Sequence, residues 1–91
     1  MSSALVSIVV PSFNQGRYIG ETLRSCLAQD YRPIEILVMD GGSTDDTVSV
    51  LRSFGAPELS WWSAPDAGVA NAVNKGLRRA KGEIIKHPVF R

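Results

Sequence analysis

The sequence has little cysteine and little histidine, with one of each, Cys26 and His87, among 91 residues. A single cysteine cannot form a disulfide within the chain, and no cysteine pair stands at the spacing of a zinc site. A reducing compartment fits this composition. A lone histidine beside Pro88 is poor evidence for catalysis, so the chain offers no metal-ligand cluster and no histidine-based active site.

An excess of charge of either sign and long apolar runs are also lacking. Ten basic and nine acidic residues give a net charge of +1, which provides no electrostatic footprint for nucleic acid or an anionic membrane surface. No apolar run approaches the roughly 20 residues of a membrane helix. The segment from Met1 to Leu5 lacks the basic and apolar regions of a signal peptide. We expect a cytoplasmic protein, and peripheral membrane association of a longer protein stays open.

Common nucleotide-binding and hydrolase motifs are missing as well. There is no phosphate-binding P-loop, no Gly-x-Gly-x-x-Gly, no Gly-x-Ser-x-Gly and no His-Glu-x-x-His. The chain is long enough for one small domain with a modest core, and 44% of its residues are hydrophobic. Function must therefore be sought in residues outside these motifs.

Four short apolar runs predict β-strands, over residues 5–10, 34–39, 59–63 and 83–85. Between them, apolar residues recur at helical spacing, beginning at residue 17, in the segment after Ser43, and at Val69, Val73 and Leu77. Pro11 and Pro88 are expected to interrupt their strands. The alternation with short connections predicts an α/β fold: a parallel, doubly wound, Rossmann-like sheet of about four strands with three helices.

Polar residues follow the first three predicted strands, at 11–14, 40–43 and 64–66. In open α/β sheets, ligands bind beyond the carboxyl ends of the strands. Asp40 has two open interpretations: it accepts hydrogen bonds from a ligand, or it caps the backbone of its own turn. Phe13 either stacks on a nucleobase or is a half-buried loop aromatic.

Charged and amide residues on the later segments also allow two interpretations. Four of them share one face of the third predicted helix: Asn71, Asn74, Lys75 and Arg78. This face is either exposed to solvent, or Lys75 or Arg78 on it contacts a phosphate. Asp45 and Asp46 resemble a metal pair, but they are expected in the first helical turn, where carboxylates favour the helix dipole. Ser43 and Asp46 have capping-box-like spacing. Trp61 and Trp62 should point to opposite sides of their strand.

Several of these segments together resemble the N-terminal, nucleotide-binding half of family 2 glycosyltransferases. The resemblance runs from about Leu5 to Ile85 and rests on separate motifs in the same order and spacing: Ser7–Asn14, Ile36–Asp45, Pro65–Gly68, Asn74–Gly76 and Ala80–Ile85. It implies the GT-A fold and a nucleotide-sugar donor, commonly a UDP-sugar. It also implies inverting hexosyl transfer to a glycan or lipid acceptor.

The resemblance also implies which residues bind the nucleotide. The loop from Pro11 to Asn14, with Phe13, would border the nucleoside, and Asp40 would contact the uracil. The segment from Asp66 through Asn74 to Lys75 would lie over the nucleotide pocket. The alternative is a non-catalytic α/β nucleotide-binding or protein-interaction domain, because a shared fold does not make an enzyme. A receiver-like phospho-acceptor role for Asp40 is a distant third, since Pro11–Ser12 replaces the expected acidic pair.

Two departures from the family pattern limit what the resemblance implies. Asn71 stands where the family often has Asp, and residues 86–91 replace the Asp-x-Asp metal motif that normally follows Ile85. We therefore expect residues 1–91 to be one truncated glycosyltransferase domain with no catalytic residues and no metal site. Mg²⁺ or Mn²⁺ is expected only in a full-length enzyme. A homodimer through the exposed sheet face or edge is a further prediction.

Overall fold

The computed structural model describes residues 4–86. Strands and helices alternate along it in the predicted order: β1 (Val6–Ser12), α1 (Ile19–Ala28), β2 (Ile34–Asp40), α2 (Thr47–Ser53), β3 (Leu59–Ser63), α3 (Val69–Arg79) and β4 (Glu83–Lys86). The strands are short and rich in β-branched residues, as a buried parallel sheet requires. The predicted α/β architecture is confirmed.

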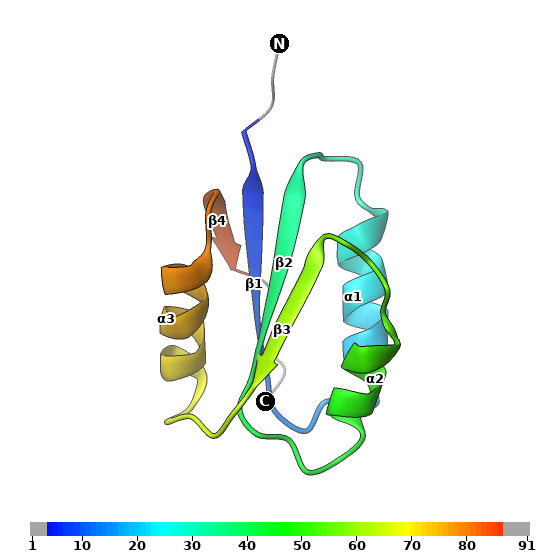
Figure 1. The fold of residues 1–91 in the computed structure, drawn as a ribbon, viewed down its shortest axis with the longest axis vertical. Helices are drawn as coiled ribbons and strands as arrows, with labels where there is room; N and C mark the ends of the chain where they lie inside the picture. Colours follow the sequence, from blue (N-terminus) through cyan, green and yellow to red (C-terminus); the bar gives the residue numbers. More distant parts are fainter. Residues whose placement is uncertain (1–3, 87–91) are drawn as a thin grey trace.

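The four strands form one parallel sheet in the order β3-β2-β1-β4. The first three strands are laid down in one direction, and the chain then crosses to the other side of β1 to place β4 (Figure 1). Helices α1 and α2 cover one face of the sheet and α3 covers the other. This change of direction makes the fold doubly wound.

Alternate residues of the central strands divide the core into two parts. The face under α1 and α2 holds the larger part, in which the following residues are buried: Val6, Ile8, Val10, Ile19, Leu23, Cys26, Ile34, Ile36, Val38 and Leu51. Burial raises the pKa of the Cys26 thiol, so Cys26 behaves as a small apolar side chain.

The face under α3 is built from fewer and smaller side chains. Val9, Leu37, Met39 and Ala72 are its buried members. The prediction that Val69, Val73 and Leu77 would form the apolar side of α3 is wrong in part, because Ala72 and Gly76 are the buried residues of this helix. A Cβ on Gly76 would lie 2.4 Å from Cγ1 of Val9. Small residues therefore let α3 approach β1 closely.

Two details at helix starts and strand ends differ from expectation. The Ser43–Asp46 capping box is not formed, since α2 begins at Thr47 and Asp46 makes no capping hydrogen bond. Pro11 does not end β1 but lies within it, opposite Met39 of β2. The residues of β1 that pair with β4 are Val6 to Val9, so Pro11 interrupts no described β1–β4 pairing.

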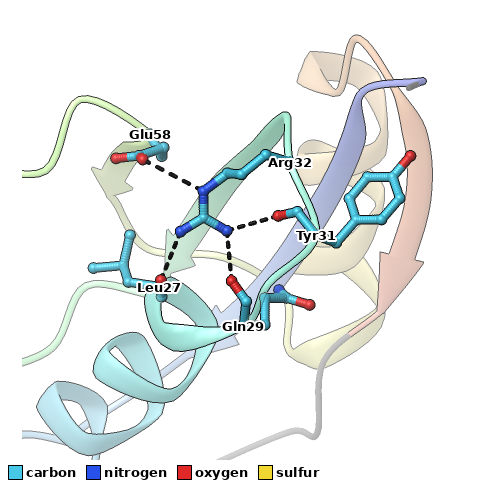
Figure 2. Close-up of polar contacts among 5 residues, drawn as sticks. All are labelled: Leu27, Gln29, Tyr31, Arg32 and Glu58. Carbon is cyan, nitrogen blue, oxygen red and sulfur yellow. Dashed lines mark hydrogen bonds and ion pairs between the residues drawn. The ribbon is translucent and has the colours of Figure 1, made fainter. Parts of the chain in front are cut away.

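Arg32 closes the carboxyl end of α1, which has no basic residue in its last turn. Its guanidinium donates to the carbonyl oxygens of Leu27, Gln29 and Tyr31 at 2.6–2.8 Å, and lies 3.9 Å from Glu58 (Figure 2). A cation at this end offsets the helix dipole and satisfies otherwise unpaired carbonyls. None of the helices in residues 4–86 is long and apolar enough to cross a membrane.

Candidate functional site

Three strands end side by side at the carboxyl edge of the sheet. Their last residues are in register, Ser12 beside Asp40 and Asp40 beside Ser63. Because the strands are parallel, the loops that follow them emerge on the same side. Among the described residues, the Ser12 hydroxyl is the buried side-chain polar atom without a hydrogen-bond partner. This edge is where the sequence places its candidate binding residues.

Asp40 holds the middle of this row and is only 3% exposed. Its Oδ2 accepts hydrogen bonds from the Gly42 and Ser43 amides at 3.2 and 2.8 Å and from the Ser63 hydroxyl at 2.8 Å. Its Oδ1 accepts one, from the Ser43 hydroxyl at 2.6 Å. The turn-capping interpretation of Asp40 therefore describes this structure. Each carboxylate oxygen offers about two lone-pair positions, so Oδ1, which accepts one hydrogen bond, keeps capacity for one more donor.

Asn14 ties the β1–α1 loop to the β2–α2 loop. It takes the left-handed conformation, with φ of 51°, which Asn tolerates better than most residues. Its side-chain oxygen accepts hydrogen bonds from the backbone amides of Thr44 and Asp45 at 2.8 and 3.3 Å. Its backbone amide donates to the Ser43 hydroxyl at 2.8 Å. The predicted site residue Asn14 is thus a structural link that holds two loops together.

Asp45 makes a second connection between these loops. One of its oxygens accepts from the amide and hydroxyl of Thr47, and the other accepts from the Gly16 amide at 3.0 Å. The hydrogen bond from the Thr47 hydroxyl is the main reason that the pKa of Asp45 is lowered. Asp45 precedes α2 and joins the two loops. The expectation that Asp45 and Asp46 lie in the first helical turn is wrong, because α2 begins at Thr47 and its first turn holds no acidic residue.

Phe13 and Pro11 differ in their accessibility. Phe13 is 39% exposed at the start of the β1–α1 loop. Pro11 is among the fully buried side chains. It shapes the strand end without presenting a surface to a ligand.

Asp66 lies against the backbone of the β2 turn. A Cβ on Gly41 would lie 2.9 and 3.0 Å from the Asp66 carboxylate oxygens, so a side chain at position 41 would require the Asp66 carboxylate to shift. Asp66 also accepts from the Gly68 amide at 2.9 Å. Asn71 accepts from the Ala67 amide at 3.1 Å. Asn71 therefore keeps the acceptor that an Asp would supply here and gives up only the negative charge.

A cavity of about 470 Å³ opens between the strand ends and α3. Its wall at the strand ends is formed by Asp40, Ser63, Ala64 and Asp66, and the remainder by Met39, Trp62, Lys75, Arg78 and Arg79. Its volume lies in the range of small-molecule sites. The structure thus brings three predicted site residues, Asp40, Asp66 and Lys75, to one cavity. Asn74 is exposed on α3 and does not line it.

Ser63, Trp62 and Arg79 line the cavity but were not assigned a role from sequence. The guanidinium carbon of Arg79 lies 4.3 Å from the centre of the Trp62 ring, a cation–π geometry. Trp61 packs on the α1–α2 side of the core and Trp62 on the α3 side, which confirms their opposite orientation. The alternation of side chains along a strand predicts that Trp61 and Trp62 point to opposite faces of the sheet. The pairing of Trp62 with Arg79 depends on how α3 packs on the sheet and cannot be predicted from that alternation.

No metal centre is formed by the part of the chain that the structure describes. Residues 4–86 contain no group of three or more His, Cys, Asp or Glu side chains placed to hold a metal ion. Asp45 is committed to Thr47 and Gly16, and Asp40 to the amides and hydroxyls around it. These residues do not fit a divalent cation site.

Comparisons with known proteins agree with this architecture. An uncharacterized glycosyltransferase of Rickettsia typhi is 38% identical over 83 residues, which are 91% of this chain and 26% of that protein. The mannosyltransferase PcManGT of Pyrobaculum calidifontis, solved with GDP-Man and Mn²⁺, superposes with a TM-score of 0.83 at 33% identity, over 92% of this chain and 27% of that one. S. aureus TarS, solved with UDP-GlcNAc, superposes with a TM-score of 0.76 at 28% identity, over 89% of this chain and 25% of that one.

The chain therefore spans about a quarter of the length of these relatives. Its α/β sheet is the Rossmann-like fold of the GT-A glycosyltransferases. The family description that matches the sequence is that of glycosyl transferase family 2, over residues 7–86. Because the match covers most of the chain, this protein belongs to glycosyl transferase family 2.

Proposed function

We propose that this chain is the nucleotide-binding part of a glycosyltransferase that uses a nucleotide-sugar donor of the UDP type. The observation that carries the proposal is the cavity at the strand ends, which is lined by Asp40, Asp66 and Lys75. Two structural relatives were solved with nucleotide-sugars, GDP-Man and UDP-GlcNAc. Both support a nucleotide-sugar donor, and only the second supports the UDP type.

The roles of the side chains follow from their contacts. Oδ1 of Asp40, which has one hydrogen bond, would accept the imide N–H of a uracil. Phe13 would stack on the base. Lys75, on the cavity wall, would offset phosphate charge. Pro11 and Asn14 would act indirectly, by fixing the strand end and the linked loops that border the nucleoside.

Transfer itself is proposed for the longer protein. We propose inverting transfer of a hexosyl group to a glycan or lipid acceptor, in the cytoplasm, with Mg²⁺ or Mn²⁺ held by residues outside 4–86. The metal would offset charge on the leaving diphosphate. Residues 1–91 alone, as one partial domain, would bind nucleotide without catalysing transfer, and a homodimer through the exposed sheet remains a prediction for sedimentation to test.

A titration of the 91-residue chain with UDP, followed by residue-resolved NMR, tests the binding role. We expect amide shifts centred on Phe13, Asn14 and Asp40, with an affinity little changed by Mg²⁺. Lys75→Gln should weaken UDP binding about threefold to tenfold, the range of an exposed or half-buried charge contact. Lys81→Gln, just beyond the far end of α3, is the matched control and should bind like the parent.

The second candidate is a non-catalytic interaction domain on the same scaffold. It is favoured if a folded chain shows no shifts at millimolar UDP. Shifts spread evenly over the surface, or equal weakening by Lys75→Gln and Lys81→Gln, would likewise remove the support for a nucleotide site.

A further inference from the structure

The turn between α3 and β4 is held by two side chains of the central strands. The Lys81 amide donates to Oε2 of Glu35 at 2.7 Å, and the Gly82 amide donates to the Ser7 hydroxyl at 2.9 Å. The Ser7 hydroxyl in turn donates to the same Glu35 oxygen. These residues form a turn clasp: Ser7, Glu35, Lys81 and Gly82.

Ser7 is a polar residue in an apolar strand. It is fully buried between Val6 and Ile8 of β1 and lies opposite Glu35 in the β1–β2 register. Burying a hydroxyl costs free energy unless it forms hydrogen bonds, and Ser7 both donates and accepts one. Backbone amides carry the same requirement. The polar pair in the sheet therefore has a clear partner, which is the pair of amides in the turn.

The turn also lies directly on the first residues of β1. A Cβ on Gly82 would lie 2.2 Å from the carbonyl oxygen of Leu5, and the Glu83 amide donates to that oxygen at 2.8 Å. A backbone atom cannot move aside as a flexible side chain can. The clasp thus holds the turn in one closely defined position, at the amino ends of the central strands.

The position of the turn determines where α3 ends. The helix runs antiparallel to the strands, from the carboxyl edge of the sheet toward the turn (Figure 1). Its buried residues, Ala72 and Gly76, are small, so few large side chains fix its end on the sheet. Arg79 is the last residue of α3, two positions before Lys81, and its guanidinium carbon lies 4.3 Å from the centre of the Trp62 ring at the cavity.

We propose that Ser7 and Glu35 are positioning residues for the α3 side of the cavity and act from the opposite edge of the sheet. They contact the turn and not the cavity. By holding the Lys81 and Gly82 amides, they set where Arg79 lies relative to Trp62. The inference rests on the proposed function only where nucleotide affinity is measured, because the geometry of the cavity wall can be followed without a ligand.

Breaking the clasp in the folded 91-residue chain tests the proposal. In Ser7→Ala and Glu35→Ala, we expect amide exchange at Lys81 and Gly82 to become about tenfold faster, as for loss of one hydrogen bond. The Trp62 indole N–H signal in NMR should move toward its position in Arg79→Gln, which lacks the cation–π contact. Glu35→Gln keeps an oxygen acceptor for both donors and should restore the parent signal.

Three controls separate positioning from general loss of stability. Leu51→Ala weakens the core on the other face and should leave the Trp62 signal in place. Lys81→Gln keeps the backbone amide and should do the same. Glu35→Ala combined with Arg79→Gln should move the signal no further than Arg79→Gln alone, because both changes act on one contact.

Two results would overturn the proposal. The first is an unmoved Trp62 signal in the alanine variants despite faster exchange at Lys81 and Gly82, which would limit the clasp to local turn stability. The second is an equal shift in Leu51→Ala. If Ser7→Ala does not fold, the comparison of Glu35→Ala with Glu35→Gln decides the matter, since Glu35 is only half-buried.

Nucleotide affinity distinguishes this proposal from the proposed function. Both alanine variants should raise the Kd for UDP about twofold to fivefold, as for residues that act on a site from a distance, and Glu35→Gln should restore it. If the parent chain does not bind UDP, the proposed function fails, and the Trp62 signal alone confirms or overturns the role of the clasp. Parent-like UDP affinity in variants whose Trp62 signal has moved would overturn the positioning role.

Discussion

The two faces of the sheet are built for different tasks. Under α1 and α2, buried side chains of the two helices, among them Ile19, Leu23 and Leu51, pack over the aliphatic side chains of β1 and β2. Under α3, the buried side chains are fewer and two of the helix contacts are Ala72 and Gly76. The cavity opens on this second face, next to the close contact between α3 and the sheet. The first face supplies stability, and the second combines close packing with space for a ligand.

The two tryptophans of β3 show the same contrast at the level of single residues. Trp61 lies at the edge of the larger core, with Arg52 6.0 Å from its ring centre. Trp62 lies beside the cavity, with Arg79 at 4.3 Å. Adjacent residues of identical type thus meet an apolar core on one side and a cationic cavity on the other.

Truncating one leucine on each face tests the comparison most directly. Leu51→Ala removes a fully buried side chain under α2 and should lower the free energy of unfolding by about 2–5 kcal/mol. Leu77→Ala removes a partly buried side chain under α3 and should cost about 1–2 kcal/mol, in proportion to the apolar area lost. Urea unfolding measures both.

The volume-conserving Leu51→Met is the control and should cost less than about 1.5 kcal/mol. Equal losses for the two alanine variants would show that the faces contribute alike and would break the comparison.

Enlarging Gly76 tests the close approach of α3. A methyl group there would meet Val9 Cγ1 at 2.4 Å and Met39 Cγ at 3.3 Å, and Val9 is fully buried and has no room to move. Gly76→Ala should destabilise the fold by about 1–3 kcal/mol through overpacking, despite alanine's better helix propensity. Gly55→Ala, where nothing lies within 4 Å, should change the urea midpoint little. A stabilised Gly76→Ala would mean that α3 is free to move outward.

Arg32 tests how the larger face is held at its end. Arg32→Ala removes three hydrogen bonds to carbonyl oxygens and should lower stability by about 1 kcal/mol, because the side chain is partly exposed. Glu58→Gln should have a smaller effect, since an exposed ion pair contributes little. Thermal unfolding compares both with Arg24→Ala, an exposed α1 variant. A larger loss from Glu58→Gln would assign the stabilisation to the ion pair instead of the cap.

The smallest effect is expected from the pH dependence of Asp45. Its folded pKa lies below the ordinary value of 3.8, so its ionised form stabilises the fold. That contribution is complete above pH 3.8 and is lost as the pH falls through the lower, folded pKa. Asp45→Asn should flatten this part of the stability profile between pH 5 and about 2.5, whereas Asp46→Asn should not. If the parent and Asp45→Asn lose stability identically as the pH is lowered, the Asp45 carboxylate does not stabilise the connection between the two loops.

Local patterns in the sequence were enough to predict the order of the elements. Apolar runs such as 34–39 and the helical spacing before them depend on residues close together, and the parallel sheet follows from their alternation. The resemblance assigned Asp40, Asp66 and Lys75 to the nucleotide pocket, and the structure places all three on one cavity. Whether they bind nucleotide remains for the titration to decide.

Contacts between distant segments could not be read from those patterns. Asn14 accepts hydrogen bonds from residues about 30 positions away. These long-range hydrogen bonds hold the start of the β2–α2 loop, where the spacing of Ser43 and Asp46 had predicted a local capping box. The buried side of α3 was predicted from its larger apolar residues. In the structure the buried residues are Ala72 and Gly76, because the helix lies so close to β1 that only small side chains fit. The pairing of Arg79 with Trp62 depends on the resulting position of the helix.

The place of β4 beside β1 has a consequence for how the chain acquires its structure. Val6 pairs with Glu83 and Ser7 with Ile84, so one edge of β1 pairs with residues that come 77 positions later in the sequence. Contacts this distant slow folding, because a long loop must close before they form. During synthesis, one side of β1 stays unpaired until almost the whole segment has left the ribosome. The nascent chain should therefore first order β1, β2 and β3 with α1 and α2, and add α3 and the cavity last.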